Sequence, residues 1–219
     1  MNDKRTTGPH TGRRFVFGAL VVLTTLSSAI AASAQSLPVP TTLDDFFQPG
    51  TQPNTIVEPV IAGTACNLCH AFFPAQNSPA DRWSTTIMAQ AARDPLFHAA
   101  MTIANQDASF AGDLCLRCHT PSGWLSGHST PTDGSALTGI NDWDGVTCNA
   151  CHRMIDPVFT PGQSPAIDQQ IIAALPATPV NAHSGQYIID PLDRRRGPFQ
   201  LSPGFSFHPW FQSPFHRKS

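Results

Sequence analysis

Three five-residue segments hold every cysteine of the chain. They are Cys66-Asn67-Leu68-Cys69-His70, Cys115-Leu116-Arg117-Cys118-His119 and Cys148-Asn149-Ala150-Cys151-His152. Each segment places two thiols three residues apart and a histidine directly after the second thiol. On one turn of helix, positions i, i+3 and i+4 lie on the same face. Each segment therefore predicts two nucleophilic sulfurs and one imidazole that point in the same direction.

This spacing predicts covalent attachment of haem. The two thiols can reach the two vinyl groups of one porphyrin while the imidazole binds the iron from the same side. The sequence thus predicts three haem c groups, with the six cysteines Cys66, Cys69, Cys115, Cys118, Cys148 and Cys151 as attachment residues. The predicted proximal iron ligands are His70, His119 and His152.

Two other uses of paired cysteines stay open. Disulfides are common in exported proteins, but they give no reason for the three histidines. Zinc sites need four ligands, and segments roughly 30 to 50 residues apart would have to share them.

A six-coordinate haem needs a second axial ligand from elsewhere in the chain. Histidine pairs give low reduction potentials, whereas a histidine with a methionine raises the potential. The candidate distal ligands are Met88, His98, His208 and His216. His128 and His183 fall in predicted loops and are weaker candidates.

The first 34 residues are typical of a secretory signal peptide. Four basic residues precede an apolar stretch over residues 15–30, and Ala32-Ser33-Ala34 offers a cleavage site before Gln35. We therefore expect a periplasmic or secreted protein, exported by the general secretory route. The alternative is an N-terminal membrane anchor, because the apolar stretch is close to the length of a membrane span.

Removal of residues 1–34 leaves 9 basic and 14 acidic residues, a net charge of −5. This acidic balance argues against nucleic acid as a partner and favours docking to basic patches of redox proteins.

The remaining chain divides into an extended lead segment over residues 35–62 and one domain over residues 63–219. Twenty-one prolines and fifteen glycines predict a mainly α fold with extensive irregular loops and little regular structure. We expect Phe46 and Phe47 to pin the lead segment to the domain, and residues 120–147 to form a loop. Trp124 and Trp143 in that loop are expected to pack on a porphyrin.

Several short elements can be predicted from their end signals. Ser78-Pro79 is typical of a helix start and predicts a helix through residues 80–93, and Pro95 begins a second helix that ends near Asp107. Asp113 is the predicted N-cap of the turn that carries the second cysteine pair. A helix over residues 164–175 and a strand over residues 187–189 complete the prediction.

The order of the first haem segment and Trp83-x-x-Thr86-x-Met88 resembles multihaem cytochromes of the cytochrome c-554 and hydroxylamine oxidoreductase group. The resemblance extends over roughly residues 60–219 and is specific only at the haem segments. In that group a histidine stands at the position of Met88 and reaches a different haem. The resemblance therefore implies that Met88 is an axial ligand.

Residues 207–216 resemble the stretch that such cytochromes place just before another haem segment, with His208 and His216 as ligands. Either the sequence is truncated before a further haem-bearing segment, or the protein is a minimal three-haem form. The expected function is electron transfer to or from redox partner proteins, among them a membrane quinol-linked donor.

Two other functions stay open. One is an oxidoreductase, or a subunit of one, acting on a small nitrogen or sulfur compound, and the other is a structural haem subunit of a larger complex. The only lysines are Lys4 and Lys218 and the only tyrosine is Tyr187. Since no set of acid and base groups stands out, no catalytic residue is predicted.

Overall fold

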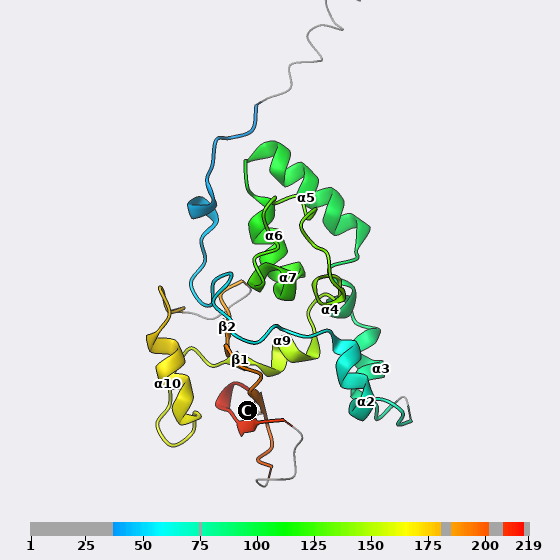
Figure 1. The fold of residues 1–219 in the computed structure, drawn as a ribbon, viewed down its shortest axis with the longest axis vertical. Coiled ribbons are helices and arrows are strands. Elements are labelled where there is room, and N and C mark those ends of the chain that lie inside the picture. The colour runs from blue at the N-terminus through cyan, green and yellow to red at the C-terminus, as the bar shows by residue number, and fades with distance from the viewer. Residues whose placement is uncertain (1–36, 75, 181–184, 202–207, 217–219) are drawn as a thin grey trace, which may run out of the picture. The chain divides into compact units, whose positions relative to one another are not determined.

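Short helices joined by irregular loops make up most of the described chain. The computed structural model describes residues 37–74, 76–180, 185–201 and 208–216. The chain separates into Met1–Leu37 and Pro38–Ser219, and the description below concerns the second unit. The predicted signal peptide with its cleavage site, and His183, lie outside the described residues. The predicted mainly α class with extensive loops is confirmed (Figure 1).

The helices are mostly one or two turns long. In chain order they are α2 (Asn67–His70), α3 (Pro79–Ser84), α4 (Ile87–Gln90), α5 (Pro95–Asp107), α6 (Gly112–His119), α7 (Pro121–Leu125), α8 (Ile140–Trp143), α9 (Cys148–His152) and α10 (Ala166–Ala173). Three 3₁₀ turns, η1 (Leu43–Phe46), η2 (Gly63–Cys66) and η3 (Pro214–His216), accompany them. Helices α2, α6 and α9 each end at the histidine of one cysteine segment.

Two small sheets join distant parts of the sequence. Strand β1 (Met154–Ile155) pairs antiparallel with β2 (Ile188–Ile189). Strand β3 (Arg195–Gly197) pairs in parallel with β4 (Trp210–Gln212). Because β1 follows α9 directly, these pairs bring the C-terminal part of the chain beside the third cysteine segment.

Most predicted helix starts are confirmed, and their caps explain them. The Ser78 hydroxyl accepts a hydrogen bond from the Asp81 amide at 3.3 Å, and the Asp94 carboxylate accepts one from the Leu96 amide at 2.9 Å. A side-chain acceptor before the first turn satisfies amides that have no partner inside the helix. The helix from Pro95 to Asp107 has the predicted bounds, and α10 lies inside the predicted range 164–175.

The helix predicted over residues 80–93 is wrong, because the structure has two helices there. The hydroxyls of Ser84, Thr85 and Thr86 each donate to the carbonyl three residues earlier. Such local bonds compete with the helix ladder. The Thr86 hydroxyl then accepts from the Ala89 amide and caps α4.

Three further predictions need correction. Asp113 lies in the first turn of α6, whose N-cap is Ala111, and its carboxylate accepts from Trp124 Nε1 and Ser129 Oγ instead. Residues 120–147 contain α7 and α8 as well as loop. The strand at Ile188–Ile189 is confirmed, but the described residues form three more strands. Their partners lie far away in sequence, which periodicity does not reveal.

The lead segment runs extended along the domain, apart from η1, and main-chain bonds hold it there. The Thr51 amide donates to the Tyr187 carbonyl at 3.0 Å, and the Asn54 amide donates to the Leu125 carbonyl at 2.8 Å. Of the two phenylalanines predicted to pin it, Phe46 is partly buried and Phe47 is 45% exposed. The main-chain hydrogen bonds therefore hold this segment together with at most one of the two rings.

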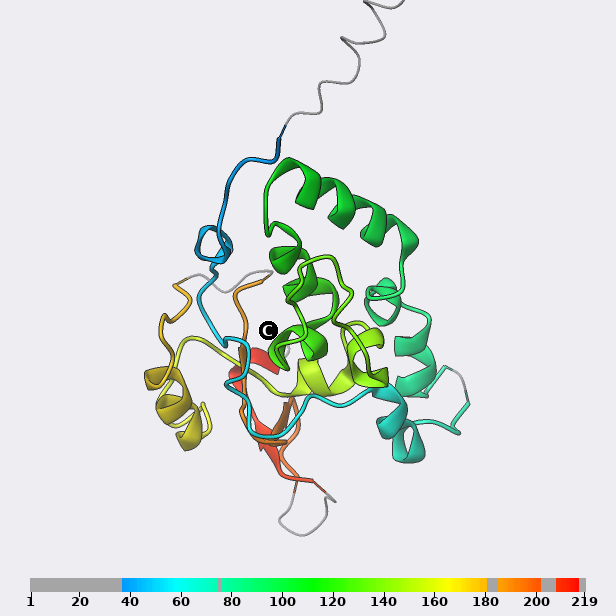
Figure 2. The ribbon, with the colours of Figure 1, turned by 45° about the horizontal axis from the view of Figure 1, so that its top comes forward.

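One apolar cluster lies among the helices. Its buried members are Val60, Phe97, Met101, Leu116, Trp124, Leu125, Leu137, Ala150 and Ile189. Leu116 belongs to the second cysteine segment and Ala150 to the third, so the residues between the cysteines face the core. The cysteines and histidines of those segments are only partly buried (Figure 2 shows α6 and α9 from a second side).

Candidate functional site

The three cysteine segments form the helical turns that their spacing predicts. The first runs through η2 into α2, the second ends α6, and the third forms α9. The Thr147 hydroxyl caps α9 by accepting from the Ala150 amide at 3.1 Å. All six cysteines are described and unpaired, so no disulfide joins the segments.

Main-chain carbonyls orient two of the three segment histidines. His119 Nδ1 lies 3.2 Å from the Ala91 carbonyl, and the Phe97 ring stacks on the imidazole with centroids 4.1 Å apart. His152 Nδ1 lies 2.8 Å from the Arg196 carbonyl. A histidine that donates one ring N–H to a carbonyl presents its other nitrogen as a metal ligand. Nε2 is the nitrogen available in both residues.

His216 lies opposite His152. The two ring centroids are 5.9 Å apart and the ring planes are within 18° of parallel. His216 Nε2 is buried and has no hydrogen-bond partner among the described residues. Burial lowers the pKa of His216, which keeps the ring in the neutral form that binds metals. Two imidazoles bound to one metal through nitrogens, with bonds of roughly 2.0 Å, have centroids roughly 6 Å apart.

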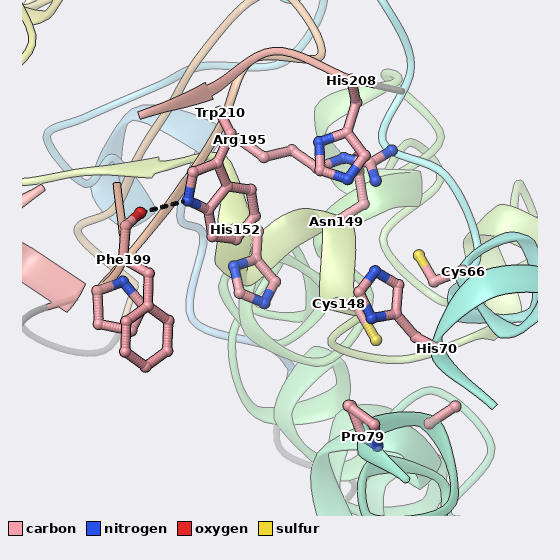
Figure 3. Close-up of a pocket in the computed structure, with 12 residues that line it drawn as sticks. Cys66, His70, Pro79, Cys148, Asn149, His152, Arg195, Phe199, His208 and Trp210 are labelled. Carbon is pink, nitrogen blue, oxygen red and sulfur yellow. Dashed lines mark hydrogen bonds between the residues drawn. The ribbon is translucent and has the colours of Figure 1, made fainter. Parts of the chain in front are cut away.

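A hollow of about 260 Å³, partly open to solvent, lies between the first and third segments (Figure 3). Cys66 and His70 border it from one side, and Cys148 and His152 from the other. The remaining lining residues are Pro79, Ala80, Asn149, Arg195, Pro198, Phe199, His208 and Trp210.

An adjoining hollow of about 600 Å³ is also lined by Leu68, Cys69 and Leu201. Because the lining is largely apolar with a few convergent polar groups, it has the character of a cofactor site.

The first and third segments also interact through their sulfurs. A side-chain hydrogen bond with Cys148 lowers the pKa of Cys66 to about 7, while the same contact, followed by burial, raises the pKa of Cys148. A lowered pKa gives more of the nucleophilic thiolate at neutral pH. The two segments are thus neighbours in space although 82 residues separate Cys66 from Cys148.

The other predicted distal ligands differ in their surroundings. His208 borders the hollow with His70, its ring centroid is 5.7 Å from that of Trp210, and burial lowers its pKa. His98 Nε2 lies 2.9 Å from the Ala92 carbonyl, with the ring 5.7 Å from Trp143. Met88 has a side chain that is 52% exposed. The structure brings His208 and His216 to the cysteine segments most clearly.

The two tryptophans expected to cover a porphyrin have different positions. Trp124 is buried, donates its indole N–H to Asp113, and lies under the guanidinium of Arg117. Trp143 lies beside the His98 ring. His128, a weaker candidate, bonds through Nδ1 to the buried Asp142 carboxylate at 2.9 Å.

Sequence reasoning missed a set of buried charges around these segments. Arg117, Arg153 and Arg196 are the largest of the fully buried side chains, and Asp168 and Asp190 are buried with them. Arg196 Nη2 bonds to Asp168 and lies 2.7 Å from Asp190 Oδ2, and Arg194 pairs with Asp190 at 2.8 Å. Burial raises the pKa of Asp168, although Arg196 opposes this shift. The dense charges between Asp190 and Arg196 were the signal available in the sequence.

Comparisons with protein-family models, with curated proteins and with solved structures found no match to the chain. In the described ranges no helix is both long enough and apolar enough to cross a membrane. Among these same residues, no three or more His, Cys, Asp or Glu side chains are gathered closely enough to hold a metal ion by themselves, as a zinc site would require.

Proposed function

We propose that the protein is an exported electron-transfer protein that carries three covalently attached haem c groups. Cys66 and Cys69, Cys115 and Cys118, and Cys148 and Cys151 hold the porphyrins. His70, His119 and His152 are the proximal ligands. Bound haem supplies reversible one-electron chemistry at its iron.

The pairing of His152 with His216 carries this proposal. The ring centroids lie 5.9 Å apart, close to the roughly 6 Å of two imidazoles bound to one metal ion, and the buried Nε2 of His216 has no hydrogen-bond partner among the described residues. A buried polar atom without a hydrogen bond is destabilising by about 1–3 kcal/mol, so such atoms call for an explanation. An iron bound to His152 would give His216 Nε2 a partner if it also bound that nitrogen.

The surroundings of the segments fit a porphyrin. Apolar hollows adjoin the thiols of the first and third segments, and a carbonyl orients the imidazoles of the second and third. Haem groups on the first and third segments would lie next to each other, since Cys66 and Cys148 border one hollow. Adjacent redox centres with both axial positions filled favour passage of electrons.

The open space near His70 favours one alternative function. The larger hollow, bordered by His70, Arg195 and His208, is open to solvent, so a small molecule could reach a haem held there. An iron held by His70 with its second axial position vacant could act on a small nitrogen or sulfur compound. The spin state of the irons separates this oxidoreductase from a simple carrier.

The partners and location follow from the same proposal. A signal peptide would deliver the chain to the periplasm or outside the cell, where haem is attached. The net charge of −5 after removal of residues 1–34 favours partners with basic docking surfaces.

Mass spectrometry of the protein, purified from a host that attaches haem c, tests the cofactor directly. We expect the mass of the processed chain plus three haems, and two or fewer would contradict the proposal. Low-temperature EPR should show only low-spin ferric iron for a carrier, whereas a high-spin signal in the native protein would support the oxidoreductase.

The variant His216→Ala tests the axial pair. It should convert one low-spin iron to high spin without changing the haem count, because haem remains attached through Cys148 and Cys151. His128→Ala is the matched control, since His128 bonds to Asp142 and is expected to leave the EPR spectrum unchanged.

A further inference from the structure

Arg117 is a buried cation inside the second cysteine segment. Its side chain is 1% exposed. Nε donates to the Gly185 carbonyl and Nη2 donates to the Pro49 carbonyl at 2.9 Å. The guanidinium carbon lies 4.2 Å from the ring centroid of Trp124 and 5.0 Å from that of Tyr187. The third nitrogen, Nη1, is buried with no hydrogen-bond partner among the described residues.

No carboxylate in the described chain bonds to this guanidinium. Its partners are carbonyls and aromatic faces, which stabilise a cation but leave its charge in place. The buried Arg196 differs, because Asp168 and Asp190 both contact it. Removing a charge from water is strongly unfavourable unless an opposite charge compensates. Because arginine does not lose its proton in proteins, Arg117 keeps its positive charge inside the domain. The Asp113 carboxylate acts on this charge electrostatically without a hydrogen bond to it.

That charge lies close to the predicted haem attachment site. Arg117 directly precedes Cys118, and the Gly185 residue that accepts its hydrogen bond also faces this cysteine. A Cβ atom built on Gly185 would lie 3.5 Å from Cys118 Sγ. The protein interior is less polarisable than water. A buried cation in the residue next to Cys118 therefore acts more strongly on a redox group at that cysteine than a surface charge does.

We infer that Arg117 raises the reduction potential of the haem carried by Cys115 and Cys118. Reduction adds one negative charge to that group, and a cation near the attachment site that forms no hydrogen bond with a carboxylate stabilises the reduced form. The inference rests on the proposed function, since it requires haem on this segment. Arg117 acts through its charge and is a tuning residue, not an iron ligand.

Potentiometric titration of the holoprotein tests this inference, with Arg117→Gln and Arg117→Lys compared. Gln keeps a hydrogen-bond donor but removes the charge, whereas Lys keeps the charge. We expect one of the three midpoint potentials to fall in Arg117→Gln and to be largely restored in Arg117→Lys. Arg82→Gln, which removes an exposed charge from α3, is the control and should leave all three midpoints in place.

The shifted midpoint can be assigned to its segment. In a Cys115→Ala background the haem on this segment keeps a single thioether bond and one free vinyl group. Its absorbance band then moves away from the others, and its potential can be followed separately. The fall caused by Arg117→Gln should appear in this marked haem, and a fall in another haem would overturn the inference.

Failure of the inference is distinct from failure of the proposed function. Fewer than three haems on the native protein would refute the proposed function. Three haems whose midpoints agree between native protein and Arg117→Gln, with unchanged EPR spectra, would refute only the role of Arg117. If Arg117→Gln does not fold, Arg117→Met in the same titration gives the charge-neutral comparison, and the same outcomes apply.

Discussion

Replacing Arg196 by Met should destabilise the protein strongly. The guanidinium has no solvent exposure and bridges two buried carboxylates, Asp168 at 1% exposure and Asp190 at 0%. Arg194 continues to pair with Asp190 in the variant, so Asp168 is the carboxylate that loses its compensating charge. Removing one partner of a buried ion pair is typically destabilising by about 3–5 kcal/mol.

Thermal unfolding of the haem-loaded protein measures this loss. For a domain of this size, about 3–5 kcal/mol lowers Tm by roughly 6–20 °C. The double variant Arg196→Met with Asp168→Asn should recover part of the loss, because it removes the uncompensated charge. Arg82→Gln is the exposed control and should stay within about 0.5 kcal/mol of the native protein.

A loss of less than about 1 kcal/mol in the free energy of unfolding of Arg196→Met would refute the reasoning. Exposed ion pairs contribute up to about 1 kcal/mol, so burial of this pair would then have no effect of its own. Equal Tm values for the single and the double variant would also contradict it, since Asp168 would then not be the cause. His152 Nδ1 lies 2.8 Å from the Arg196 carbonyl, so the proposed function also predicts a shift in the EPR signal of the iron bound to His152.

Three further predictions concern the backbone, the caps and the cofactor. Gly145→Ala should lower stability by more than about 1–2 kcal/mol in urea unfolding, because φ is +67° and the new Cβ would collide with the Met88 carbonyl oxygen. Gly139→Ala, with open space around its Cβ position, is the control, and an equal loss there would contradict the steric argument. Ser78→Ala and Thr86→Ala should each be destabilising by about 1 kcal/mol through loss of a helix cap, and no change in midpoint urea concentration would show that the caps do not matter. Protein made without haem attachment should show no cooperative unfolding by circular dichroism, since the hollows beside its thiols would have no filling, and a sharp transition would contradict this.

Sequence reasoning succeeded where the signal is local. The helical turns at the three cysteine segments, the cap at Ser78, and the helix from Pro95 to Asp107 depend on neighbours a few residues away. Those interactions are visible in a single sequence. The break between α3 and α4 also has a local cause, the three consecutive hydroxyl residues 84–86. The good helix formers on either side nevertheless led to the prediction of one continuous helix.

The sequence predicted which residue types form the candidate site, but not which of those residues contact each other. The spacing predicted His152 as a proximal ligand, and the resemblance of residues 207–216 made His216 a candidate distal ligand. Only the fold brings the two ring centroids to 5.9 Å. The same holds for Arg117, whose position in the sequence gives no sign that Trp124 and Tyr187 enclose it. Contacts between residues far apart in sequence depend on the path of the loops, which carries no periodic signal.

The lead segment has a consequence for the order of folding. Thr51 is made early, but its partner Ile189 follows 138 residues later, and their hydrogen bonds in both directions are buried. The early residues therefore have nowhere to dock until most of the chain exists. Pairings of such long range slow folding, since the ends of a long loop must first meet. During that interval the thiols at 66 and 69 would stay uncovered, which gives the time in which a porphyrin could be joined to them.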